Sequence, residues 1–416
     1  MQYDVSDLSL ADQGARRVAW AERTMPVLGL LRARWAGQRP LDGRVVVACM
    51  HVTTETAALV RALTSAGAQV HLAASNPLST QDDVAAALVS QGVGVFARHG
   101  VDRAGYAAHL AAALDAGPEL VVDDGCDLVQ LLHAQPARLS GVRAGVEETA
   151  TGVLRLRQMT AEQALRLPMV AVDGTAVQRL VANRHGTGQS TLDAVLRATG
   201  VLLAGSTVVV AGYGPCGRGI AERARGLGAH VVVTEVDPGR ALEAVLDGHR
   251  VLPMALAATE AHVLVTATGD RGVVRGEHLA LLRDGAVLAN AGHFDVEIDV
   301  PALEAAAVRV SRRVRPFVDS YELADGRRLL LLAEGRLANL AAAEGHPAAV
   351  MDVSFAITAL TLEWLVQPAQ RGLAPGVHEV PAAIDDEVAR SKLAALGVRL
   401  DVLTADQERY LSTWRA

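Results

Sequence analysis

The sequence has 416 residues, 50% of them hydrophobic and only 3% aromatic, so it is long enough for two or three domains with cores of small aliphatic side chains. This composition favours helices packed on buried parallel strands, an α/β fold. The 39 basic and 46 acidic residues give a net charge of −7, which excludes a cationic surface for nucleic acid and favours a small-molecule partner.

The first 173 residues are predicted to form one α/β domain. Their N-terminal stretch, MQYDVSDLSLADQG, is polar, and no apolar run in the chain reaches the roughly 18 residues of a membrane span. We therefore expect a cytoplasmic protein that does not enter a membrane. A strand followed by a helical pattern appears at GRVVVACMHVTTETAALVRALTSAGAQVHLAAS and again at PELVVDDGCDLVQLLHA, and each is typical of a βα unit.

Polar clusters follow the predicted strands of this domain. His51 lies in CMHVTTET, Asp124 in DDGCD and Glu148 in GVEETATG. Because ligands bind at the carboxyl ends of the strands in such sheets, these side chains are candidate site residues, and a carboxylate with a raised pKa could act as a base there. Each also has a structural interpretation: a satisfied histidine, an Asp-Gly turn and a helix cap, respectively.

Residues 205–236 predict a dinucleotide site. The segment STVVVAGYGPCGRGIAERARGLGAHVVVTEVDP has the order strand, glycine-rich turn, helix, strand. Gly212, Gly214 and Gly217 form the G-x-G-x-x-G pattern, whose turn brings a pyrophosphate to a helix N-terminus. Glu235 ends the second strand, where a carboxylate binds ribose hydroxyls and repels a 2′-phosphate, so NAD is predicted rather than NADP. An ordinary strand-to-helix turn is the alternative.

The remaining elements extend this pattern and return to the first domain. Apolar strands at AHVLVTATG and GAVLANAGHF place residues 189–343 in a Rossmann-type, doubly wound cofactor domain. After His346 comes a long helical pattern, VMDVSFAITALTLEWLV, so residues 1–173 and 347–387 are assigned to the second α/β domain and 388–416 to a helical C-terminal segment. His293 and His346 are both expected to face the interdomain cleft.

The three cysteines predict neither a metal site nor a disulfide framework. They are odd in number, far apart and without paired spacing: Cys49, Cys126 and Cys216.

Taken together, these segments resemble the S-adenosyl-L-homocysteine hydrolase family over nearly the whole chain. The matching blocks, in the family's order, are CMHVTTET, VVDDGCDL, GVEETATGV, VVAGYGPCGRG, TEVDP, NAGHFDVEID and LAEGRLANLAAAEGHPAAVM. The resemblance implies a substrate domain (residues 1–173 and 347–387) and an NAD domain that close over an adenine nucleoside, with one NAD per protomer in a homotetramer.

The resemblance also implies the chemistry and the site. NAD oxidises the nucleoside at C3′, which acidifies the C4′ proton, so that a base can remove it and the 5′ substituent can leave before the hydride returns. By position, the catalytic residues are His51, Asp124, Glu148, His293 and Asn183. The substrate contacts are Thr53, Glu55, Gln178 and His346. The cofactor contacts are Thr149, Thr151, Gly212, Gly214, Gly217, Glu235, Asn290 and Asn339.

One segment departs from the family. Where the family has N-D-S-x-T-K-S-K-F-D-N, this chain reads DGTAVQRLVAN over residues 173–183. Gln178 takes the place of a lysine that assists oxidation at C3′, and Ala182 takes that of an aspartate. These positions are four apart and share a helix face, so the lysine and the aspartate of the family can form an ion pair. Because both are lost together, neither charge is left buried without a partner. Arg179 and His185 are the nearby side chains that could compensate.

Other departures concern the cleft and the C-terminus. Cys126 replaces a family glycine and Ala150 a threonine. The family's tail, which reaches the NAD of a neighbouring protomer, is missing because the chain stops at LSTWRA. Self-association as a dimer or tetramer is expected.

Three functions follow. The leading hypothesis is a redox-neutral dehydration of an adenine nucleoside to a 4′,5′-unsaturated sugar, which would suit biosynthesis of a nucleoside antibiotic. The alternative is hydrolysis of S-adenosyl-L-homocysteine to adenosine and homocysteine. The third is an inactive regulator that binds NAD and nucleoside.

Overall fold

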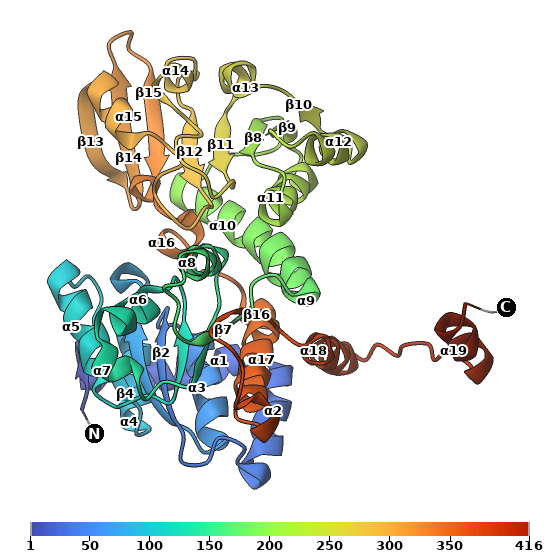
Figure 1. Cartoon of the computed structure of the whole chain (residues 1–416). Coiled ribbons are helices and arrows are strands. Elements are labelled where there is room, and N and C mark those ends of the chain that lie inside the picture. The colour runs from blue at the N-terminus through green and yellow to red at the C-terminus, as the bar shows by residue number, and fades with distance from the viewer. Residues whose placement is uncertain (1, 415–416) are drawn as a thin grey trace.

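Two eight-stranded sheets organise the protein, one in each half of the molecule (Figure 1). The computed structural model describes residues 2–414. The first sheet is entirely parallel and has the order β1 (Asp4–Val5), β4 (Gly94–Ala97), β3 (Gln69–Ala74), β2 (Val45–Met50), β5 (Leu120–Asp123), β6 (Ala144–Glu147), β7 (Pro168–Ala171), β16 (Gly376–Glu379).

The second sheet has a parallel part and an antiparallel extension. Its order is β10 (Arg250–Val251), β9 (His230–Thr234), β8 (Thr207–Ala211), β11 (Val263–Thr266), β12 (Val287–Asn290), β15 (Arg328–Leu332), β14 (Val318–Leu323), β13 (Ala307–Arg315). The first six strands are parallel, and β14 and β13 are added antiparallel. The α/β, doubly wound fold class is confirmed, whereas the antiparallel extension was not predicted.

Helices connect the strands and cover both faces of each sheet (Figure 1). They are α1 (Ala11–Glu22), α2 (Pro26–Gln38), α3 (Thr54–Ser65), α4 (Asp82–Ser90), α5 (Arg103–Leu114), α6 (Asp127–Ala134), α7 (Pro136–Leu139), α8 (Ala150–Ala161), α9 (Ala176–Gln178), α10 (Thr187–Thr199), α11 (Pro215–Gly226), α12 (Pro238–Leu246), α13 (Met254–Glu260), α14 (Gly276–Leu279), α15 (Val300–Ala306), α16 (Ala338–Ala341), α17 (Ala348–Leu365), α18 (Ala382–Ala395) and α19 (Ala405–Ser412). A π-helical stretch, Arg179–Gly186, joins α9 to α10.

The helix α17 is a core element of the first half. It is the one described helix that is long and apolar enough to cross a membrane by length and composition, but 67% of it is buried inside the protein. It packs against α2, α3 and α18, and its Val353, Phe355 and Ile357 belong to the core cluster that also contains Val46 of β2. Its burial explains the apolar run as core packing.

The only lysine of the chain has a structural role in this core. Asp352 on α17 is completely buried and accepts hydrogen bonds from the backbone N–H groups of Val27 and Leu28 at the start of α2, at 3.2 and 2.9 Å. Lys392 Nζ on α18 lies 2.7 Å from the same carboxylate. The ion pair therefore ties three helices together.

Lys392→Met is expected to lower the free energy of unfolding by about 3 kcal/mol, because it leaves the buried Asp352 carboxylate without its counter-charge. Urea denaturation measures this change. The matched control is Arg390→Met on the same helix, whose ion pair with Asp386 is exposed and should be worth less than about 1 kcal/mol. Equal midpoints for the two variants would contradict the structural role of Lys392.

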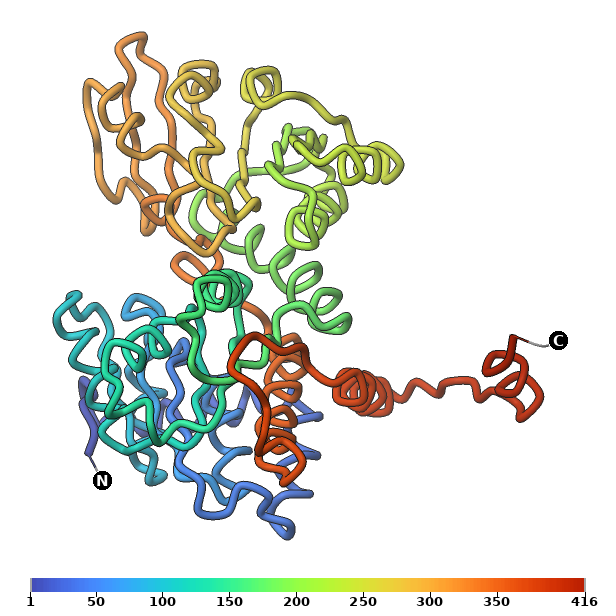
Figure 2. The backbone as a smooth tube through the Cα atoms, viewed as in Figure 1, coloured from blue at the N-terminus to red at the C-terminus, as the bar shows by residue number. Residues whose placement is uncertain are grey.

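The C-terminal segment extends away from the body of the protein. Figure 2 shows the chain after α18 leaving the first half as an extended segment that leads to α19. Every residue from 396 to 414 is exposed. Of the predicted C-terminal ending LSTWRA, the last two residues lie outside the described part of the chain.

Candidate active site

Two adjoining cavities lie between the two halves. The larger cleft, of about 1220 Å³, is lined by the glycine-rich turn after β8 and by loops of the second sheet. The smaller pocket, of about 190 Å³, is lined by loops that follow strands of the first sheet, by the helices α3 and α17, by the π-helical stretch and by residues 337–346. The residues that line both are Thr149, Asp173, Asn183, His293, Leu337, Asn339 and His346. A cofactor in the cleft would therefore meet a substrate in the pocket at these side chains.

The glycine-rich turn has the geometry that a dinucleotide needs. Gly212 has φ +95°, a conformation that favours glycine, and a Cβ added to Gly214 would point into open space, with only an Arg240 nitrogen at 3.8 Å. A Cβ on Gly217 would lie 1.9 Å from the carbonyl oxygen of Gly212, so this glycine packs α11 against the turn. The residues present fit a pyrophosphate at the start of α11.

Glu235 closes the adenosine-ribose end of the cleft. Its carboxylate accepts hydrogen bonds from the backbone N–H groups of Tyr213, Val236 and Asp237 at 2.7–3.0 Å. Although partial burial opposes this, the three N–H groups hold the pKa of Glu235 below its usual value. The side chain is therefore ionised and fixed in place, as discrimination against a 2′-phosphate requires.

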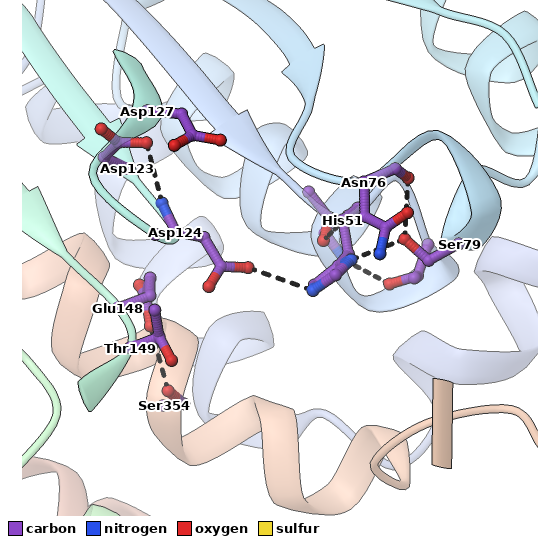
Figure 3. A network of polar contacts seen from close by, with 12 residues as sticks. His51, Asn76, Ser79, Asp123, Asp124, Asp127, Glu148, Thr149 and Ser354 are labelled. Carbon is purple, nitrogen blue, oxygen red and sulfur yellow. Dashed lines mark hydrogen bonds and ion pairs between the residues drawn. The ribbon is translucent and has the colours of Figure 1, made fainter. Parts of the chain in front are cut away.

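His51 and Asp124 face each other at the edge of the first sheet (Figure 3). They follow β2 and β5, neighbouring strands at which the chain order of the sheet reverses, and ligands bind at such switch points. His51 Nε2 lies 3.4 Å from the Asp124 carboxylate, and His51 Nδ1 lies 2.5 Å from Ser79 Oγ. The histidine and the carboxylate thus lie close enough to act as a pair.

The hydrogen bonds of Ser79 hold the imidazole ring in place. The Ser79 hydroxyl donates to the Asn76 carbonyl oxygen at 3.0 Å, and its oxygen lies 2.5 Å from His51 Nδ1. Nε2 is therefore the ring atom that faces Asp124. This is the arrangement of a general acid–base group.

Glu148 is a buried carboxyl group beside this pair. It follows β6, is 8% exposed, and accepts hydrogen bonds from Ser354 Oγ at 3.2 Å and from Thr358 Oγ1, both on α17. Burial raises its pKa to about 8, with the two hydroxyl groups opposing that shift. Glu148 is therefore mainly protonated at neutral pH and offers hydrogen bonds to a polar ligand.

His293 reaches this cluster from the other sheet, from the loop after β12. Burial lowers its pKa, Asp124 opposes that effect, and His51 adds to it. Gly125, next to Asp124, has φ +119°, and a Cβ there would lie 3.7 Å from His293 Nε2. The two halves therefore contribute to one site.

The other predicted substrate contacts also lie around the pocket. Thr53 caps α3, and Glu55 accepts a hydrogen bond from Thr54 at 2.8 Å. Burial lowers the pKa of His346 to about 4, and its Nε2 lies 3.0 Å from Thr187 Oγ1. This histidine is neutral.

The altered segment lines the pocket as predicted for positions 178 and 182. Gln178 and Ala182 are each 5% exposed and both border the pocket, although a π-helix rather than an α-helix begins at residue 179. Gln178 Oε1 has no hydrogen-bond partner among the described residues, and its Nε2 lies 3.4 Å from the Glu148 carbonyl oxygen. A free, buried amide oxygen indicates a ligand with a hydrogen-bond donor.

Asn290 does not lie where a cofactor contact was expected, and the two side chains considered as replacements for the lost pair do not border the pocket. Asn290 borders neither cavity, because its amide bonds Thr266, Gly292, Phe294 and Gly335 and shapes the loop that holds His293. His185 is exposed and borders neither cavity, and Arg179 borders only the cleft. Thr149, Thr151 and Asn339, which were predicted as cofactor contacts, border the cleft.

The supporting residues Ser79, Ser354 and Thr358 escaped the sequence analysis. Each is a small hydroxyl residue in an ordinary helical context, and nothing local marks its partner. In the described part of the chain, no group of three or more His, Cys, Asp or Glu side chains could hold a metal ion.

Comparisons with known proteins agree with this geometry. A profile of the S-adenosyl-L-homocysteine hydrolase family matches residues 2–143, and one of the S-adenosyl-L-homocysteine hydrolase, NAD binding domain, matches residues 183–345. The chain is 54% identical to adenosylhomocysteinase of Aquifex aeolicus and 50% identical to that of Saccharolobus solfataricus, over 100% of this chain and 99% and 100% of those proteins. The expected shortening of the C-terminus therefore does not separate the chain from these two relatives.

Among solved structures, a dipicolinate synthase from Bacillus halodurans superposes with a TM-score of 0.51 at 14% identity. The match covers 78% of this chain and 99% of that one, and it shows a shared fold alone.

Proposed function

Because the chain belongs to the S-adenosyl-L-homocysteine hydrolase family and is an NAD-dependent enzyme, we propose that it removes the 5′ substituent of an adenine nucleoside through a 3′-keto intermediate. The observation that supports this is the cluster of His51, Asp124 and Glu148 facing His293 where the pocket meets the dinucleotide cleft. An inactive regulator would have no use for such an acid–base pair.

Each group of the site has a role in the proposed reaction. Bound NAD supplies reversible oxidation at C3′, which makes the C4′ proton acidic. Glu148 holds the sugar hydroxyls by hydrogen bonds. The His51–Asp124 pair removes the C4′ proton and delivers a proton to the departing 5′ group.

Two leaving groups have support. The curated relatives are adenosylhomocysteinases at about half identity over their full length, and this favours S-adenosyl-L-homocysteine as substrate, with adenosine and homocysteine as products. One observation favours the second candidate, loss of water to give a 4′,5′-unsaturated nucleoside: Gln178 and Ala182 stand in the pocket where the family has a lysine and an aspartate. A reshaped sugar site is consistent with a different substrate, such as an intermediate of a nucleoside antibiotic.

Mass spectrometry of products distinguishes the candidates. The purified protein is incubated separately with S-adenosyl-L-homocysteine, adenosine and a ketose-derived adenine nucleoside. Release of adenosine from the thioether supports the hydrolase, and a product lighter than its nucleoside by one water supports the dehydratase. If 3′-deuterated substrate lost its label to water, or if protein with bound NAD converted none of the three, the proposed chemistry would be wrong.

Self-association is part of the proposal. The C-terminal arm, residues 396–414, exposes Leu400, Val402, Leu403, Tyr410 and Leu411. Such an apolar arm supports contact with another copy of the chain, in a dimer or tetramer.

A further inference from the structure

The altered segment keeps only Asn183 of the family's pattern, so its changes extend beyond positions 178 and 182. The family's segment N-D-S-x-T-K-S-K-F-D-N starts with asparagine, and this chain has Asp173 at that position. A neutral amide is thus exchanged for a carboxyl group in the same stretch in which both lysines and both aspartates of the family's pattern are lost. The segment has not simply lost its ionisable groups.

Asp173 lies where oxidation would take place. It follows β7, at the same edge of the first sheet as His51 and Asp124, and it lines both the pocket and the cleft. A hydride can pass from a sugar carbon to a nicotinamide only where these two cavities meet. Among the described residues that line both cavities, Asp173 is the only one with a carboxyl group.

Its surroundings leave the carboxylate available. Within residues 2–414, the one side-chain hydrogen bond to Asp173 comes from Asn183 Nδ2, at 3.2 Å to Oδ1. Burial raises the pKa of Asp173, while Asn183 and the guanidinium groups of Arg179 and Arg157 oppose that shift. The Glu148 carboxyl group and the Cys216 thiol are the other ionisable groups that sense its charge.

Three other ionisable groups of the site, Glu148, Asp124 and His346, already have partners. Both oxygens of Glu148 are bound by Ser354 and Thr358. Asp124 faces His51, and His346 is bound to Thr187. The amide of Gln178 cannot accept a proton at neutral pH.

We propose that Asp173 is the catalytic base for the 3′-hydroxyl group, in the role that the family's lysine assists, with Gln178 as a neutral hydrogen-bond partner of the sugar. The O–H bond breaks and its proton moves to the Asp173 carboxylate. The C3′–H bond breaks and its hydride, with both electrons, moves to NAD, so that the C3′ ketone forms. The last step of the reaction reverses these transfers. This inference rests on the proposed oxidation–elimination chemistry.

Asp173→Asn restores the family's residue and tests the role directly. With the nucleoside that the mass-spectrometric experiment identifies, a single turnover is followed by the near-ultraviolet absorbance of reduced nicotinamide. We expect the oxidation rate to fall about 10²–10⁴-fold, the range for loss of a general base, with NAD still bound. The matched control, Asp386→Asn on the exposed face of α18, should keep the wild-type rate. Wild-type oxidation by Asp173→Asn would overturn the proposal.

A rescue experiment tests whether Asp173 takes the role that the lysine has in the family. Adding Gln178→Lys and Ala182→Asp to Asp173→Asn rebuilds the family's set, and oxidation should recover at least about tenfold if one base replaces the other. If Asp173→Asn loses NAD or fails to fold, the variants Asp173→Glu and Asp173→Gln are compared instead, because their side chains have the same size and differ in whether they carry a carboxyl group. The glutamate variant should then oxidise faster than the glutamine variant, and equal rates would overturn the proposal.

Equilibrium binding gives a readout that needs no turnover. On protein reconstituted with NADH, which cannot oxidise the substrate, calorimetry compares the nucleoside with its 3′-deoxy analogue. A charge-assisted hydrogen bond to the 3′-hydroxyl predicts a preference of about tenfold or more in the wild type, reduced several-fold by Asp173→Asn. An unchanged preference would contradict contact with that hydroxyl. If the wild-type protein oxidised no nucleoside, the proposed function itself would fail, which is a distinguishable outcome.

Discussion

His51→Ala and Asp124→Asn are each expected to reduce kcat by about 10²–10⁴-fold while the purified protein keeps its full complement of NAD. The reason is that the pair, 3.4 Å apart, lines the substrate pocket and does not line the dinucleotide cleft. Product formation is measured together with the NAD released on denaturation. His185→Ala, an exposed histidine outside both cavities, is the matched control and should behave as wild type.

The step that fails can be identified separately. If the pair acts after oxidation, both variants should still form reduced nicotinamide from the nucleoside, but they should exchange the C4′ proton with solvent far more slowly than wild type. Loss of NAD from either variant, or an unaffected exchange rate, would mean that the pair is structural.

Local sequence patterns were sufficient to predict the parallel strands with their helices, the glycine-rich turn and the side chains that follow the strands. The turn from Gly212 to Gly217 lies between a valine-rich strand and a helix, so it was recognisable from a short stretch of chain. His51 and Asp124 follow buried strands, and parallel sheets bring such ends together whatever the loops between them. Short-range periodicity and one topological rule therefore place the acid–base pair.

Long-range pairing explains what was not predicted. β16 joins β7, about 200 residues earlier in the chain, and neither strand has a local sign of its partner. Likewise Ser354 and Thr358 reach Glu148 across more than 200 residues.

Asn290 has the residue type of a ligand contact, but both the oxygen and the nitrogen of its side-chain amide form hydrogen bonds within the protein. Its role depended on backbone geometry that no sequence pattern contains.

Gly217→Ala is expected to yield protein without NAD and without turnover. A methyl group at this position would lie 1.9 Å from the carbonyl oxygen of Gly212, so either the glycine-rich turn or α11 must move, and the backbone that approaches the pyrophosphate moves with it. The NAD content of the purified variant and its thermal unfolding, with and without added NAD, measure the effect. Wild-type protein should gain thermal stability from NAD, and the variant should gain none.

Gly226→Ala is the matched control because it makes the same change at the other end of α11. A Cβ there meets no atom within 4 Å, so NAD content and turnover should stay at wild-type values, with stability unchanged or slightly increased. Loss of NAD from both variants would indicate general sensitivity of α11. Full NAD binding by Gly217→Ala would show that the turn tolerates displacement, and that the cofactor is held mainly elsewhere in the cleft, at Glu235 and Asn339.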